Sequence, residues 1–236
     1  MIASQGLLFL HSVCEMLPIS SSWHLKYFFQ ASSLSTHIYH IWLLPILLCI
    51  LMVRSERKDF ASPYILCATS LPAMLLYIGN KMGVIEKWSV PISLLHFLMG
   101  VGLFLIAYRQ SQSDSSEPDL PTHLIWSYMG IGQAFGMMIP GISRLGTSLL
   151  PAMFFKMNFR RSLVISFSLD ILILMGSAGL DIFKHTVVLP SLLEIVITSL
   201  GFSLGWVVLE HFQWRLIGLI GIYRVLLGIA LFFNVI

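Results

Sequence analysis

The chain has 236 residues, of which 57% are hydrophobic and 11% are charged, and its mean hydropathy is +0.86. Soluble domains carry about 25% charged residues, so this composition excludes a soluble globular protein and predicts a polytopic membrane protein. The formal net charge of +3 is small, and we expect no nucleic acid partner. The length fits one compact bundle and leaves no room for a soluble catalytic domain.

Six apolar segments predict membrane-spanning helices. A helix needs about 20 apolar residues to cross the hydrocarbon core of a bilayer. The segments that qualify are each bounded by polar or charged residues: 37–53, 61–79, 90–108, 162–183, 188–209 and 215–236.

Two further apolar regions, 3–30 and 123–155, are interrupted by polar residues around Pro18 and Pro140. Each half is too short to span, and a proline inside a helix removes a backbone hydrogen bond. Non-helical backbone at membrane depth persists only where protein or water surrounds it. We therefore expect two re-entrant helical hairpins in an all-α polytopic membrane fold.

The two interruptions resemble each other in sequence. Residues 16–21 (MLPISS) parallel residues 138–144 (MIPGISR), which contain one additional glycine. Three predicted spans follow each hairpin, and because three is an odd number the second unit is inverted relative to the first. The expected single membrane domain, 1–236, consists of a first repeat at 1–108, a cytoplasmic linker at 109–122 and a second repeat at 123–236.

Basic residues are distributed unevenly over the predicted loops. The loops on one side contain eight lysines and arginines, and the loops on the other side contain four. Cytoplasmic loops are enriched in these residues, so the first side is expected to face the cytoplasm. Both termini then face the outside of the membrane.

The first interruption carries an unusual set of polar groups for a membrane segment. His11 and Glu15 are four residues apart and share one helix face. One of the serines at 20–22 can cap the next helix, whose first turn carries His24. A carboxylate cannot bind an anion directly, so Glu15 is expected to act through a divalent cation or as a proton carrier.

The second interruption supplies groups that suit an anion. Pro140 and Gly141 form the break, Ser143 is the expected N-cap of the next helix, and Arg144 lies at its start. A helix N-terminus offers free N–H groups and a positive dipole end, and arginine adds a planar fork suited to phosphate. Acid, imidazole, hydroxyl and arginine together indicate phosphoryl transfer with electrostatic stabilisation.

Each of these groups alone also has a structural interpretation. Serines in membrane helices often bond only to their own backbone, and a lone histidine or arginine often serves packing or an ion pair. Four other charged residues within or near the predicted spans are interpreted as structural: Asp170, Asp181, Glu194 and Arg224. Asp170 and Glu194 are expected to pair with arginines. Arg224 is expected to be held by a carboxylate or carbonyl group.

With these motifs, the sequence resembles the undecaprenyl-diphosphate phosphatase family of bacterial inner membranes, which is linked to bacitracin resistance. The resemblance rests on EMLPISSSWHL at 15–25 and PGISRLGTS at 140–148, and it continues at 158–181 and 221–233. It implies six spans, two re-entrant hairpins in an inverted repeat, and an active site and termini facing the periplasm. The implied reaction converts the C55 isoprenoid diphosphate into the monophosphate carrier, which serves peptidoglycan and other envelope polymers.

The resemblance also assigns roles to residues of this chain. The implied catalytic residues are Glu15 as the essential carboxylate, His24 as acid/base, Ser21 as nucleophile or phosphate ligand, and Arg144 as diphosphate ligand. The implied substrate-binding residues are Ser20, Ser22, Gly141, Ser143, Gly146 and Thr147. The mechanism stays open between attack by Ser21, with His24 taking its proton, and attack by a metal-activated water.

Several positions differ from the pattern of that family. His11 stands where a second glutamate is usual, Leu145 replaces a serine, Val164 replaces a glutamate and Leu172 replaces a proline. The resemblance implies Mg²⁺ or Ca²⁺ as the cofactor. We also consider Mn²⁺ or Zn²⁺, because a metal site formed by Glu15 and His11 would favour these ions.

The expected partners are undecaprenyl diphosphate and the lipid bilayer, with a second copy of the chain as a candidate for a homodimer. The alternative to hydrolysis is a protein that binds or transports an isoprenoid phosphate without cleaving it. Inverted repeats with hairpins are also a transporter architecture. A pure binder would need the arginine and the helix ends, but it would not need the carboxylate and the imidazole.

Overall fold

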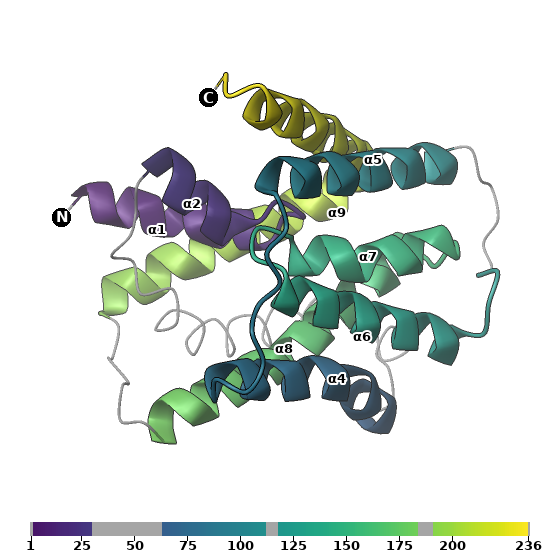
Figure 1. Ribbon diagram of the computed structural model, residues 1–236, viewed down its shortest axis with the longest axis horizontal. Helices are drawn as coiled ribbons and strands as arrows, with labels where there is room; N and C mark the ends of the chain where they lie inside the picture. Colours follow the sequence, from purple (N-terminus) through teal and green to yellow (C-terminus); the bar gives the residue numbers. More distant parts are fainter. Residues whose placement is uncertain (1, 30–62, 112–117, 184–190, 236) are drawn as a thin grey trace.

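The computed structural model describes residues 2–29, 63–111, 118–183 and 191–235 (Figure 1). Within these ranges the chain forms eight α-helices and no strand, so the predicted all-α class is confirmed for the described part. The predicted span at 37–53 lies outside the described residues.

The described helices follow the predicted segments closely. Their bounds are α1 Ile2–Glu15, α2 Ser21–Phe29, α4 Pro63–Lys81, α5 Ile92–Ser111, α6 Thr122–Met138, α7 Arg144–Phe154, α8 Phe159–Phe183 and α9 Leu192–Phe232. Helices α4, α5 and α8 correspond to the predicted spans at 61–79, 90–108 and 162–183, and α9 covers the last two predicted spans.

Helix α9 is interrupted by a kink. Its 41 residues would extend about 60 Å as one straight helix, which is about twice the hydrocarbon thickness of a bilayer. Gln213 has φ 40° and ψ −123°, so the backbone leaves the helical conformation inside the element. The boundary predicted between the spans at 188–209 and 215–236 coincides with this kink.

Both predicted helix interruptions are present. Helix α1 ends at Glu15 and α2 begins at Ser21, so Pro18 lies in the turn between them. Helices α6 and α7 are separated by residues 139–143. This second turn depends on Gly141, because its φ of +90° lies in the left-handed region that residues with a Cβ rarely adopt.

Helix α9 packs against two helices from the first half of the chain. Its first part lies beside α1 and its second part lies beside α5 (Figure 1). A Cβ added at Gly205 would lie 2.6 Å from Cβ of Met16, and one added at Gly221 would lie 2.6 Å from the backbone nitrogen of Phe104. These glycines therefore let the helix backbones approach closely, as small residues commonly do between membrane helices.

The hydrophobic core combines both halves of the chain. One cluster joins Leu103 of α5, Leu149 of α7 and Trp206 of α9, all of which are fully buried. Leu145 and Val164, two of the residues that differ from the family pattern, belong to the same cluster. Their apolar side chains therefore serve packing at these positions.

Two of the described helices, α5 and α9, are long and apolar enough to cross a membrane by length and composition. Apolar side chains also cover their outer faces: Leu98 and Leu105 of α5 and Leu219 and Leu226 of α9 are each more than half exposed. An apolar exterior around buried polar groups is the arrangement expected of a helical protein in lipid.

Candidate active site

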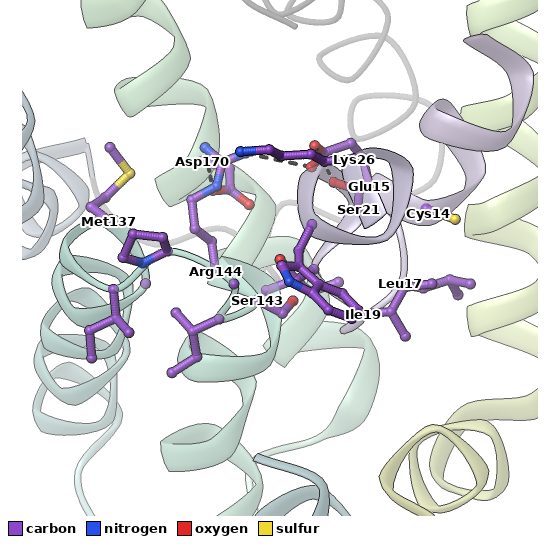
Figure 2. Close-up of a pocket in the computed structure, with 18 of the residues that line it drawn as sticks. Cys14, Glu15, Leu17, Ile19, Ser21, Lys26, Met137, Ser143, Arg144 and Asp170 are labelled. Carbon is purple, nitrogen blue, oxygen red and sulfur yellow. Dashed lines mark hydrogen bonds and ion pairs between the residues drawn. The ribbon is translucent and has the colours of Figure 1, made fainter. Parts of the chain in front are cut away.

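A cavity of about 750 Å³ lies between the two helix breaks (Figure 2). Glu15, Ser20 and Ser21 line it from the first break, and Ser143 and Arg144 line it from the second. The N-terminal ends of α2 and α7 therefore both reach the cavity. Since helix N-termini attract negative charge, this placement favours an anionic ligand.

Much of the remaining cavity wall is apolar or aromatic. The aliphatic and aromatic lining residues include Leu17, Ile19, Ile92, Ile142, Ile173, Trp23, Tyr27 and Tyr77. A pocket that combines a few convergent polar groups with apolar walls is typical of sites for small organic ligands. Here the combination suits a molecule with an anionic head and an apolar tail.

Glu15 is the centre of the polar cluster. Oγ of Ser21 donates a hydrogen bond to Oε1 of Glu15 at 2.6 Å. Nε2 of His11 lies 3.3 Å from the same oxygen, as expected for residues four apart on one helix face. His11 is 1% exposed and is not among the described residues that line the cavity, so it contacts Glu15 from the protein interior rather than from the cavity.

Arg144 lies between two carboxylates. Its Nη2 is 3.5 Å from Oε2 of Glu15, and its Nη1 is 3.8 Å from Oδ1 of Asp170. Figure 2 shows the three side chains converging at the cavity. Both separations exceed the about 2.7–2.9 Å of a charge-assisted hydrogen bond, so the guanidinium can still contact two oxygens of a phosphate group.

Helix α7 begins as the sequence predicts. Oγ of Ser143 accepts a hydrogen bond from the backbone N–H of Gly146 at 3.2 Å, and Arg144 is the first helical residue. Gly146 and Thr147 are buried and are not among the described cavity-lining residues. The Thr147 hydroxyl donates to the carbonyl oxygens of Ser143 and Arg144 at 3.1 and 2.9 Å, so it is occupied by its own helix.

The other residues expected to bind substrate have different outcomes. Ser20 and Gly141 line the cavity from the two breaks, so their placement agrees with the expectation. The side chain of Ser22 lies outside the described part of the structure. The binding roles of all three residues stay predictions.

His24 is held by partners other than Ser21. Its Nδ1 lies 2.7 Å from the carbonyl oxygen of Ser20, and its Nε2 lies 2.8 Å from the hydroxyl oxygen of Tyr223 on α9. The ring also approaches that of His96 on α5, with a centroid separation of 5.6 Å. The sequence expectation that His24 takes the proton of Ser21 is therefore not matched by this arrangement, because Ser21 donates to Glu15 instead.

Arg224 holds the turn of the first break. Its Nη1 donates a hydrogen bond to the carbonyl oxygen of Pro18 at 3.2 Å, and the side chain is fully buried. This is the carbonyl partner that the sequence interpretation required. Because Glu15 and Ser21 flank the same turn, the hydrogen bond positions both residues relative to α9.

The sequence interpretation missed three contributors to this region. Lys26 and Lys87 line the cavity, and Tyr223 binds His24. Asp170 was correctly expected to pair with an arginine, but its carboxylate also lines the cavity. Lys26 follows Ser21 closely on α2 and could have been found from that position, whereas no local pattern brings Lys87 to the site.

The donor set at the cavity fits a divalent cation in part. Glu15 and Asp170 both line the cavity, and Mg²⁺ is commonly held by one or two carboxylates together with substrate phosphates and water. Among the described residues, no group of three or more His, Cys, Asp or Glu side chains is arranged to hold a metal. His11 reaches the cavity only through Glu15, so the carboxylates fit a cation better than the predicted His11 ligand does.

Comparison with known proteins finds relatives along most of the chain. The chain is 26% identical to undecaprenyl-diphosphatase 2 of Pseudoalteromonas translucida (strain TAC 125), with 94% of this chain and 93% of that protein covered. It is 31% identical to the undecaprenyl-diphosphatase of Methanococcus maripaludis (strain C6), with 72% and 74% covered. It is 26% identical to the undecaprenyl-diphosphatase of Thermotoga maritima, with 73% and 76% covered. The model of the family described as "Bacitracin resistance protein BacA" matches residues 40–230. The chain therefore belongs to the BacA family of bacitracin resistance proteins.

Proposed function

We propose that this chain is an undecaprenyl-diphosphate phosphatase. It hydrolyses the C55 isoprenoid diphosphate to the monophosphate carrier and phosphate, which supports cell-envelope polymer synthesis and bacitracin resistance. The relatives described above carry this activity in their names. The observation that carries the proposal is the 2.6 Å hydrogen bond from Ser21 to Glu15 beside Arg144, in a cavity with largely apolar walls.

The terminal phosphate binds where Arg144 and the starts of α2 and α7 converge. The planar guanidinium can contact two phosphate oxygens, and the free backbone N–H groups at the helix starts can donate to others. Phosphoryl transfer depends mainly on positioning and on stabilising charge that develops on the phosphate oxygens. These groups are already in place around the cavity, so little rearrangement of the protein is needed.

Ser21 is the proposed nucleophile and Glu15 its proton acceptor. As the proton moves from Oγ of Ser21 to Glu15, Oγ bonds to the terminal phosphorus and the bond to the bridging oxygen breaks. The lipid leaves as its monophosphate, and water then hydrolyses the phosphoserine to release phosphate. The other route, direct attack by water, keeps Ser21 as a phosphate ligand and Glu15 as the base.

The two histidines have positioning roles in this proposal. His11 contacts Glu15 from its buried side and orients the carboxylate toward Ser21. His24 bridges the carbonyl oxygen of Ser20 and the hydroxyl of Tyr223, so it fixes the start of α2 against α9. Both contacts keep Oγ of Ser21 at a fixed place beside Glu15.

A divalent cation is the proposed cofactor, held by Glu15 and Asp170. Mg²⁺ or Ca²⁺ fits the carboxylate ligands, and Mn²⁺ or Zn²⁺ is included because His11 contacts Glu15. When bound, the cation supplies positive charge that neutralises phosphate oxygens.

The finer membrane architecture is also proposed. The chain forms one domain with six spans and two re-entrant hairpins, arranged as inverted repeats at 1–108 and 123–236 joined by a cytoplasmic linker at 109–122. The two helix–break–helix units, whose second helices both start at the cavity, support this arrangement. The protein lies in the bacterial inner membrane, with both termini and the cavity facing the periplasm, and a second copy of the chain is a candidate partner.

Phosphate release from undecaprenyl diphosphate by the purified protein in detergent tests the function. The assay includes EDTA, Mg²⁺, Ca²⁺, Mn²⁺ and Zn²⁺ arms, and Arg144→Ala is measured beside the wild type. Metal-dependent release that is lost in Arg144→Ala is expected. Lipid binding without phosphate release under every metal would contradict the proposal and favour the alternative, a protein that binds or transports the lipid without hydrolysis.

A further inference from the structure

Two lysines at the cavity have no carboxylate partner among the residues that the structure describes. Lys26 lies on α2, and Lys87 lies in the segment between α4 and α5. Both side chains are exposed and both line the cavity. Neither forms an ion pair or a hydrogen bond with the described residues, in contrast to Lys156, which pairs with Asp119 at 3.1 Å. Two cations from separate segments therefore line one cavity, and neither has a partner among the described residues.

The charge balance of the cavity depends on these lysines. Glu15 and Asp170 contribute negative charge to the described lining, and Arg144 lies between them. Before any metal ion binds, and without Lys26 and Lys87, the carboxylates would outnumber the cations and would repel a diphosphate, which is multiply anionic at neutral pH. With the lysines, cations outnumber carboxylates, so the same cavity attracts it.

The cavity also offers two distinct environments for two phosphate groups. Arg144 and Ser21 lie at the ordered helix starts, where the attacked phosphate must sit. Lys26 and Lys87 are more exposed than these residues. Figure 2 shows Lys26 along the same cavity as Glu15, Arg144 and Asp170. A flexible lysine suits a phosphate that must later leave, because its ammonium group is a mobile point charge rather than a fixed fork.

We propose that Lys26 and Lys87 form a second phosphate subsite, which binds the phosphate that remains attached to the lipid. This inference rests on the proposed phosphatase function of the same cavity. When the bond between the terminal phosphorus and the bridging oxygen breaks, its electron pair stays on the lipid monophosphate. The two ammonium groups neutralise that charge, so the lysines both select a diphosphate over a monophosphate and assist departure of the product.

The test is a binding titration on the purified full chain in detergent with non-hydrolysable probes. The probes are methylenediphosphonate, its farnesyl ester and methylphosphonate, the last of which has a single phosphonate group. The variants are Lys26→Gln, Lys87→Gln and the double variant, with Lys156→Gln as the matched control away from the cavity. Isothermal titration calorimetry gives the dissociation constants, and thermal unfolding confirms that each variant is folded.

We expect the lysine substitutions to weaken binding of the two diphosphonate probes more than binding of methylphosphonate. Each single substitution weakens binding of both diphosphonates about three- to ten-fold, the double variant weakens it further, and methylphosphonate binding changes less than about two-fold. The farnesyl ester binds more tightly than the free diphosphonate and shows the same lysine dependence, as a subsite for a lipid-linked diphosphate requires. Lys156→Gln binds all three probes like the wild type, and Lys26→Arg restores most of the affinity.

Three results would overturn the subsite. These are unchanged diphosphonate affinity in the double variant, equal losses for the mono- and diphosphonate probes, and a preference for the free diphosphonate over its farnesyl ester. Because no probe is cleaved, these results do not depend on turnover. A wild-type protein that binds the probes in this lysine-dependent way but releases no phosphate from undecaprenyl diphosphate would refute the proposed function and leave the subsite intact.

Discussion

Oγ of Ser21 donates a 2.6 Å hydrogen bond to Oε1 of Glu15 across the break between α1 and α2. Glu15 is the last residue of α1, and Ser21 is the first residue of α2. The turn that contains Pro18 therefore both interrupts the membrane helix and brings an acid and a hydroxyl together. The same interruption exposes the N-terminus of α2 to the cavity, so one local sequence feature supplies the proposed base, the proposed nucleophile and the proposed anion site.

Replacing the carboxylate of Glu15 by an amide tests its role as proton acceptor. Glu15→Gln keeps the size of the side chain but cannot accept the proton of Ser21, so kcat for phosphate release is expected to fall about 10²–10⁴-fold. Initial rates at saturating undecaprenyl diphosphate measure the effect. Glu194→Gln, in the exposed capping box at the start of α9, is the control and retains wild-type turnover. Retention of more than a tenth of wild-type kcat in Glu15→Gln would exclude Glu15 as the base.

In the proposed site, Asp170 competes with the substrate phosphate for Arg144. In Asp170→Asn one of the two carboxylates on the guanidinium is lost, and the cavity becomes more positive. In EDTA, diphosphate binding is expected to tighten about three- to ten-fold, because Arg144 is attracted more strongly to phosphate. With Mg²⁺, kcat is expected to fall, because Arg144 is less firmly positioned and a proposed cation ligand is lost. A binding titration in EDTA gives the affinity, and steady-state kinetics with Mg²⁺ give kcat. The control is Asp119→Asn, which removes the partner of Arg109 and Lys156. Weaker diphosphate binding in Asp170→Asn would contradict the role given to Asp170.

The hydrogen bond between His24 and Tyr223 is expected to contribute to stability as a pair. His24→Ala and Tyr223→Phe each remove one partner, so their effects on the free energy of unfolding should not add. A double-mutant cycle by thermal or denaturant unfolding in detergent is expected to show a coupling energy of about 0.5–3 kcal/mol. A coupling energy of zero, together with a loss of activity in His24→Ala alone, would instead indicate that His24 acts on the substrate.

Gly205 allows α9 to approach α1 closely. A Cβ there would lie 2.6 Å from Cβ of Met16, next to the end of α1 that carries Glu15. Gly205→Ala should therefore lower the thermal unfolding temperature by an amount that corresponds to about 1–3 kcal/mol and should also lower activity. Gly218→Ala is the matched control on the same helix, because its Cβ would meet Cβ of Ala107 at an ordinary 3.4 Å. Equal stability of both variants would refute the close packing of α9 on α1.

Local sequence chemistry predicted the helix ends well. Prolines stop helices and serines cap them through contacts within a few residues, so the break at Pro18 and the Ser143 cap could be recognised without any tertiary information. The gap between the last two predicted spans likewise marked the kink at Gln213. The same reasoning placed His11 beside Glu15, because a spacing of four residues fixes a shared helix face.

Contacts between distant segments could not be predicted in the same way. The approach of Asp170 to Arg144 depends on how α8 packs against α7, and the approach of Tyr223 to His24 depends on the position of α9. Thr147 was expected from its motif to bind substrate, but its hydroxyl donates to carbonyl oxygens of its own helix instead. Motif membership indicates which residues lie near a site, whereas packing decides which of them face the cavity.

The most direct test of the account is phosphate release from undecaprenyl diphosphate by Ser21→Ala beside the wild type. Ser199→Ala is the matched control, because the one hydrogen bond of its hydroxyl to the described residues goes to the Ile195 carbonyl oxygen of its own helix. Ser21→Ala should remain folded and lose at least about 10²-fold in kcat, while Ser199→Ala retains wild-type turnover. Release by Ser21→Ala at the wild-type rate would contradict the central claim that the Ser21–Glu15 pair carries the reaction.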